Sequence, residues 1–169
     1  MTFRSGYLVL ENGAVFRGKL RGAAPAVGEV VFNTSMVGYD QIISDPSYTG
    51  QIVVLTYPLV GNYGFNRAVM ESDHCCVRGL VIKELNNGAN HYQQEKLFGD
   101  YLTENNLPCL SGIDTRALTR VIRTHGTMGG VITDSIDNLP QLVEQAAGYK
   151  PPVEGYVRQA TCKEITCLG

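Results

Sequence analysis

The first half of the chain consists of short apolar runs separated by turn residues, a pattern typical of β-strands. Residues 6–18 contain two such runs around Asn12-Gly13, which favours a hairpin because both residues tolerate positive φ. Further elements are expected in this half, with strands at residues 28–35, 51–58 and 77–85 and a short helix at residues 37–44.

The second half alternates between helical and strand-like periodicity. The clearest helix is predicted at residues 114–126, where Asp114 is a suitable N-cap and Gly126 a suitable end. Another helix is predicted at residues 95–106, because its apolar side chains recur at helical spacing: Leu97, Phe98, Tyr101 and Leu102. The remaining predicted elements are strands at residues 107–113 and 128–133 and a last helix at residues 138–146.

This order of elements predicts a layered α/β domain with a mixed sheet. The 169 residues suffice for one such domain, and an apolar content of 44% allows a substantial core. We expect the domain to span residues 1–150. Residues 151–169 lose periodicity and gain prolines, which indicates a tail or linker.

Charge and hydropathy exclude several classes of partner. A net charge of −2 gives no field that would gather nucleic acid, and no apolar run approaches the roughly 18 residues that cross a bilayer. The apolar run near the N-terminus is too short for a signal peptide. We therefore expect a cytoplasmic protein that binds neither nucleic acid nor membrane.

The residues show no self-contained catalytic or metal site. The five cysteines are odd in number and lack metal-site spacing, so we interpret them as structural thiols: Cys75, Cys76, Cys109, Cys162 and Cys167. Cys167 lies in a near-match to the Gly-x-Cys-x-Gly nucleophile motif that lacks the first glycine. A thiol hydrolase that uses Cys109 or Cys167 is the least favoured alternative, because neither has an adjacent base.

The stretch between residues 44 and 51, SDPSYTGQ, carries more polar groups than a connection needs. Asp45 favours a turn through its side chain and Pro46 fixes φ, so the turn would present Ser47 rigidly. A serine hydroxyl both donates and accepts hydrogen bonds. The residues alone are compatible with a binding edge or with an ordinary surface turn.

Two long segments resemble a known family. Residues 28–64, GEVVFNTSMVGYDQIISDPSYTGQIVVLTYPLVGNYG, closely resemble the N-terminal domain of the small subunit of glutamine-hydrolysing carbamoyl phosphate synthetase. Residues 112–132, GIDTRALTRVIRTHGTMGGVI, resemble a later signature of the same domain. The likeness runs from about residue 6 to about residue 155, and the two motifs stand in the family's order.

The resemblance implies a β/β/α swivelling domain with no catalytic residue or cofactor of its own. In the family, a following amidotransferase domain hydrolyses glutamine with a Cys-His-Glu set, and a large subunit uses the ammonia, bicarbonate and two ATP, with Mg, to make carbamoyl phosphate. The serine of the DPSY motif contacts glutamine, and its counterpart here is Ser47. The implied partners are therefore glutamine, the large subunit and an amidotransferase domain that this chain does not include.

The main alternative is a free-standing adaptor or small-molecule-binding module that reuses the fold; the intact DPSY motif favours the first interpretation. The resemblance leaves open whether the chain is a fragment, whether its parent is a separate or fused subunit, and whether it serves arginine or pyrimidine synthesis. The chain alone is expected to be inactive. A docking surface for the missing partners is expected as an exposed apolar patch at Tyr57, Leu59, Val60 and Tyr63.

Overall fold

The computed structural model describes residues 3–88, 91–151 and 156. The strands are β1 (Arg4–Leu10), β2 (Val15–Arg21), β3 (Ala26–Asn33), β4 (Gln51–Leu55), β5 (Leu59–Val60), β6 (Gly79–Val81), β7 (Glu84–Leu85), β8 (Cys109–Ser111) and β9 (Met128–Thr133). The helices are α1 (Tyr39–Ser44), α2 (Phe98–Glu104), α3 (Thr115–His125) and α4 (Leu139–Ala147), with short 3-10 helices at Pro46–Tyr48 and Arg67–Val69.

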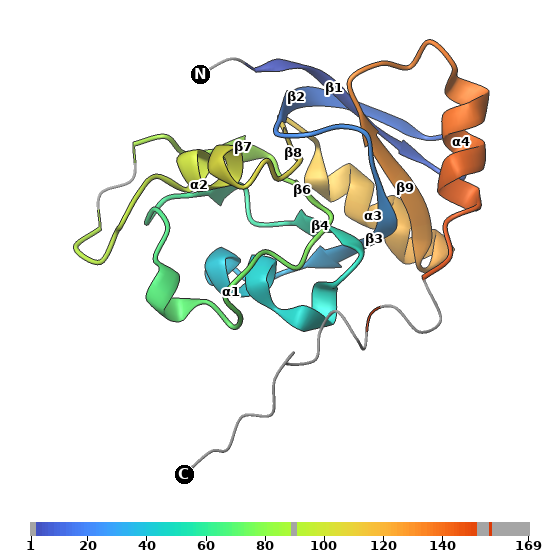
Figure 1. The fold of residues 1–169 in the computed structure, drawn as a ribbon. Coiled ribbons are helices and arrows are strands. Elements are labelled where there is room, and N and C mark those ends of the chain that lie inside the picture. Colours follow the sequence, from blue (N-terminus) through green and yellow to red (C-terminus); the bar gives the residue numbers. More distant parts are fainter. Residues whose placement is uncertain (1–2, 89–90, 152–155, 157–169) are drawn as a thin grey trace.

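Seven strands of this described part close into a barrel in the order β1-β2-β8-β6-β4-β3-β9. The run β3, β4, β6 and β8 is parallel, and the other neighbouring pairs are antiparallel. The predicted α/β fold with a mixed sheet is therefore confirmed. Strands β5 and β7 form a separate two-stranded sheet. Figure 1 shows α4 beside β9 at one edge of the molecule and α1 and α2 toward the other.

Two apolar cores hold these elements together. The first contains side chains of the barrel strands and of α3, and the second contains side chains of the strands, α1 and α2. Strand β4 contributes to both cores, because successive side chains of a strand point to opposite faces. Ile52 and Val54 belong to the first core, whereas Val53 and Leu55 belong to the second. This double burial explains why β4 is a continuous apolar run rather than an alternating one.

Most predicted elements are present near their expected positions. The hairpin at Asn12-Gly13 is confirmed by a 2.9 Å hydrogen bond from the Leu10 amide to the Ala14 carbonyl, with Gly13 at a φ of 83°. The helix predicted at residues 114–126 is also confirmed. The Asp114 side chain caps it by accepting a 2.9 Å hydrogen bond from the Ala117 amide.

One predicted strand is divided in the structure. The apolar run at residues 77–85 was expected to be a single strand, but β6 belongs to the barrel and β7 pairs with β5. The exposed side chains Lys83 and Glu84 mark the point at which the chain leaves the barrel. The prediction of one strand was wrong because the periodicity of a run does not reveal which sheet its two ends join.

The C-terminal segment lies mostly outside the described residues. Of the tail predicted at residues 151–169, only residues 151 and 156 belong to the described part, so the boundary at residue 150 stays a prediction. Cys162 and Cys167 lie outside the described residues. No helix in the described ranges has the length and apolar character needed to cross a membrane.

Candidate functional site

The turn that carries Ser47 joins α1 to β4. The Asp45 carboxylate accepts a 2.8 Å hydrogen bond from the Ser47 amide, and the Tyr48 amide donates to the Asp45 carbonyl across 3.0 Å. Pro46 begins the 3-10 helix, where its fixed φ suits the backbone. The turn therefore has the shape that Asp45 and Pro46 predicted.

The hydroxyl groups of this turn differ in how they are used. The Ser44 hydroxyl donates to the Asp40 carbonyl at 2.7 Å, and the Thr49 hydroxyl donates to the Pro46 carbonyl at 2.7 Å. The Tyr48 hydroxyl accepts a hydrogen bond from the Asn33 side-chain amide at 3.0 Å. These three side chains hold the turn together.

Ser47 is the exception. Its side chain is exposed, and among the described residues its hydroxyl makes no hydrogen bond. The turn fixes the Ser47 backbone through Asp45 and leaves the hydroxyl free to bind something outside this domain. The geometry therefore meets the requirements for a ligand contact.

The loop that follows β4 is largely engaged within the domain. The Tyr63 hydroxyl accepts hydrogen bonds from the backbone amides of Gly38 (2.7 Å) and Tyr39 (3.1 Å), and its ring stacks on Tyr39 with centroids 4.2 Å apart. The Tyr39 hydroxyl donates to the Gly64 carbonyl at 2.5 Å. Tyr63 thus caps the start of α1 in place of a side-chain N-cap, which α1 lacks.

This arrangement corrects the predicted apolar patch. Val60 is only 2% exposed and Tyr63 is half-buried against α1, so neither contributes a free apolar surface. Met36 and Val37, which the prediction missed, are 68% and 65% exposed. They line a shallow hollow together with the half-buried Tyr57 and Leu59. The exposed apolar surface of this region therefore extends to the segment between β3 and α1; we call Met36, Val37, Tyr57 and Leu59 the apolar patch.

Comparison with known proteins identifies the family. The family model "Carbamoyl-phosphate synthase small chain, CPSase domain" matches residues 8–132, which include strands β2 to β8, the Ser47 turn and α3. The chain belongs to this family. The resemblance seen in the two sequence motifs is therefore confirmed.

Several relatives bear the same name. The carbamoyl phosphate synthase small chain of Oceanobacillus iheyensis is 44% identical over 163 residues, which cover 96% of this chain and 44% of the relative. The carbamoyl phosphate synthase pyrimidine-specific small chain of Bacillus subtilis is 50% identical over 139 residues, covering 82% of this chain and 38% of the relative. This chain therefore spans less than half the length of the curated relatives it matches.

Two cysteines of this small-chain domain, Cys75 and Cys109, lie in environments that oppose thiolate formation. Burial raises the pKa of the Cys109 thiol to about 12, with a smaller opposing effect from Arg21. Burial also raises the pKa of Cys75 to about 12. Nucleophilic cysteines require the thiolate near neutral pH. Within the described ranges, no group of three or more potential metal-ligating side chains comes together.

Asp40 is a feature of the small-chain domain that the sequence analysis missed. Its side chain is 1% exposed, and neither carboxylate oxygen has a hydrogen-bond partner among the described residues. Burial raises the pKa of Asp40 to about 7, and the negative charge of Glu95 raises it further. The nearby Asn66 backbone amide lowers this pKa, although it does not reach hydrogen-bond geometry. The one sequence signal for this burial is that Asp40 stands three residues before the buried Ile43 on α1, so the two side chains share a helix face.

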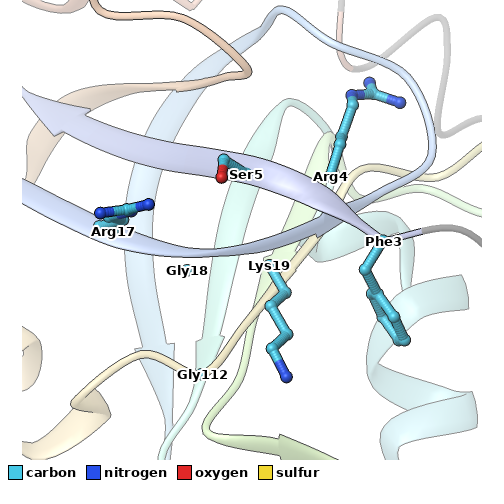
Figure 2. Close-up of a pocket in the computed structure, with 7 residues that line it drawn as sticks. All are labelled: Phe3, Arg4, Ser5, Arg17, Gly18, Lys19 and Gly112. Atoms are coloured by element: carbon cyan, nitrogen blue, oxygen red, sulfur yellow. The ribbon is translucent and has the colours of Figure 1, made fainter.

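A hollow with a cavity volume of about 490 Å³ lies beside the β1–β2 hairpin (Figure 2), and no residue of the Ser47 turn lines it. Figure 2 shows Phe3 and Lys19 pointing to one side of the hairpin and Arg4 to the other. Arg4 is already paired with Asp134 at 3.3 Å. The cationic side chains that line this hollow therefore do not converge on one position, and we assign it no ligand.

Proposed function

We propose that the chain is the non-catalytic N-terminal domain of a carbamoyl phosphate synthase small subunit, and that Ser47 completes the subunit's glutamine site. The whole enzyme would make carbamoyl phosphate from glutamine, bicarbonate and ATP. The observation that carries the proposal is that the Ser47 hydroxyl makes no hydrogen bond to any described residue, whereas the other hydroxyls of its turn are all bonded within the domain. The resemblance of residues 45–48 to the family's DPSY motif supports glutamine as the ligand of that hydroxyl.

The chemistry of Ser47 suits glutamine. Glutamine carries a carboxamide, a carboxylate and an ammonium group. A hydroxyl can donate a hydrogen bond to the carboxamide oxygen or the carboxylate, and it can accept one from the carboxamide nitrogen or the ammonium group. The Asp45 hydrogen bond fixes the Ser47 backbone before any ligand arrives. A preformed contact costs less ordering entropy on binding than a mobile one. Ser47 would form one wall of the site, and the amidotransferase domain would supply the other wall and the catalytic residues.

The functions that this domain lacks would be supplied by its partner domain and the large subunit. ATP and Mg would bind to the large subunit, and no cofactor is assigned to this chain. The apolar patch of Met36, Val37, Tyr57 and Leu59 would dock the large subunit, because two of its side chains are more than 60% exposed. Exposed apolar groups gathered in one place are typical of interaction surfaces. The 169-residue chain alone is expected to hydrolyse no glutamine.

The test uses a small subunit that contains this domain and the amidotransferase domain, assembled with the large subunit. Ser47→Ala should raise the KM for glutamine about two- to tenfold, the effect of losing one neutral hydrogen bond of about 0.5–1.5 kcal/mol. Synthesis from free ammonia should be unchanged, because ammonia bypasses the glutamine site. The contact between Ser47 and glutamine would be refuted if Ser47→Ala reduced glutamine-dependent and ammonia-dependent synthesis equally in an intact complex. It would also be refuted if the variant reduced neither.

A further inference from the structure

The base of the Ser47 turn is held by a residue from the far end of the domain. The Tyr149 hydroxyl donates a 2.8 Å hydrogen bond to the Gly50 carbonyl, although the two residues are 99 positions apart in the chain. Gly50 lies three residues after Ser47 and immediately before β4. Tyr149 follows α4, next to the segment predicted to be the linker toward the amidotransferase domain.

Gly50 fits this contact closely. Its φ is 82°, a left-handed conformation that favours glycine, and a Cβ at this position would overlap the Tyr156 hydroxyl. The Tyr156 hydroxyl also contacts the Tyr149 hydroxyl. Tyr149 and Tyr156 thus enclose one side of the Gly50 peptide. Burial and the Tyr156 contact raise the pKa of Tyr149, so its hydroxyl stays protonated and remains a donor at neutral pH.

The two ends of the turn are fixed differently. Within the turn, Asp45 bonds the Ser47 amide and Thr49 bonds the Pro46 carbonyl, contacts that are all local in sequence. Other contacts tie the turn to distant parts of the described chain. At its start the Glu71 amide donates a 2.9 Å hydrogen bond to the Ser44 hydroxyl, beside Ser47 Asn33 bonds Tyr48, and at its end Tyr149 bonds the Gly50 carbonyl. Local bonds shape a turn, whereas bonds to distant residues fix where the whole turn lies.

We propose that Tyr149 is a positioning residue for Ser47: by holding the Gly50 carbonyl, it places the turn relative to the linker and hence to the amidotransferase domain. This inference rests on the proposed function, in which Ser47 contacts glutamine. Tyr149 itself does not touch substrate. Tyr149 would affect glutamine binding indirectly, by holding the Gly50 peptide. Its effect on glutamine binding should therefore disappear when the Ser47 hydroxyl is absent.

The experiment combines hydrogen exchange and kinetics in the assembled enzyme. Tyr149→Phe removes the contact with Tyr156 and the hydrogen bond to the Gly50 carbonyl. Loss of this one hydrogen bond to the turn should make the backbone amides of residues 47–50 exchange about two- to tenfold faster. The KM for glutamine should rise by a similar factor, with ammonia-dependent synthesis unchanged. Tyr7→Phe is the matched control, since Tyr7 is also half-buried and its hydroxyl makes no hydrogen bond within the described residues.

A double variant separates this inference from the proposed function. If Tyr149 acts through Ser47, then Tyr149→Phe should raise the KM no further in a Ser47→Ala background. Unchanged exchange of the turn in Tyr149→Phe would overturn the inference, and so would a KM increase that persists in full without the Ser47 hydroxyl. Faster exchange of the turn in Tyr149→Phe, combined with a normal KM in Ser47→Ala, would instead refute the glutamine contact.

Discussion

The Asn33 side-chain amide donates a 3.0 Å hydrogen bond to the Tyr48 hydroxyl, which joins the last residue of β3 to the turn before β4. Strands β3 and β4 are parallel neighbours, so their connection must cross from one end of the pair to the other. That crossover contains α1 and the Ser47 turn. The bond fixes the crossover to the barrel beside Ser47, whose own hydroxyl has no hydrogen-bond partner among the described residues.

Removing this bond should loosen the turn without disturbing the barrel. We expect Tyr48→Phe to lower the free energy of unfolding by about 0.5–1.5 kcal/mol, because one neutral hydrogen bond is lost while the aromatic ring is retained. Urea denaturation of the 169-residue chain would measure the change. Tyr7→Phe again serves as the control. Equal stability of the two variants would mean that the Asn33–Tyr48 bond contributes nothing to the fold.

Asp40 should make stability depend on pH. Burial raises its pKa from 3.8 to about 7, so between these values the folded protein holds a proton that the unfolded chain has released. Raising the pH through this window therefore lowers the stability, and the loss is complete above pH 7. Asp40→Asn removes the titrating group, so the variant should gain stability relative to the wild type as the pH rises from 4 to 8.

Thermal unfolding across this pH range would test the role of Asp40. Glu144→Gln provides the control, because Glu144 is an exposed carboxylate on α4. The difference in Tm between Asp40→Asn and the wild type should widen with pH, whereas the difference for Glu144→Gln should not. Parallel pH profiles for Asp40→Asn and the wild type would show that the Asp40 carboxyl is not held in its protonated form.

The apolar patch gives a prediction about assembly. Burying a methionine side chain contributes about 1.5–3 kcal/mol, so Met36→Lys should weaken the association of the small and large subunits roughly ten- to hundredfold. Val15→Lys is the matched control, because Val15 is a 37% exposed apolar residue on the β1–β2 hairpin. Titration of the large subunit with each small-subunit variant should show weaker binding for Met36→Lys than for Val15→Lys. Equal affinities would place the interface elsewhere on the domain.

Local sequence chemistry was enough to predict the shape of the Ser47 turn. Asp45 and Pro46 act on their immediate neighbours, so their effects do not depend on the rest of the fold. The same holds for the Asn12-Gly13 hairpin and for the cap at Asp114. In each case the hydrogen-bond partner lies within four residues along the chain, and contacts over so short a distance can be predicted from a sequence pattern.

Contacts between distant residues could not be predicted in this way. Barrel closure pairs Val9 of β1 with Val131 of β9, and no local pattern distinguishes that pairing from an open sheet. The Tyr149–Gly50 bond was missed for the same reason. The predicted apolar patch was right in Tyr57 and Leu59 but wrong in Val60 and Tyr63, because these two apolar side chains pack against other parts of the domain.

The central claim is that the Ser47 hydroxyl contacts glutamine, and the most direct test is a structure of the assembled enzyme with glutamine bound. The catalytic cysteine of the amidotransferase domain would be replaced so that the substrate persists. The account predicts the Ser47 Oγ about 2.6–3.2 Å from a nitrogen or oxygen atom of glutamine, with the turn still held by Asp45. Glutamine bound with no atom within hydrogen-bond distance of the Ser47 Oγ would contradict it.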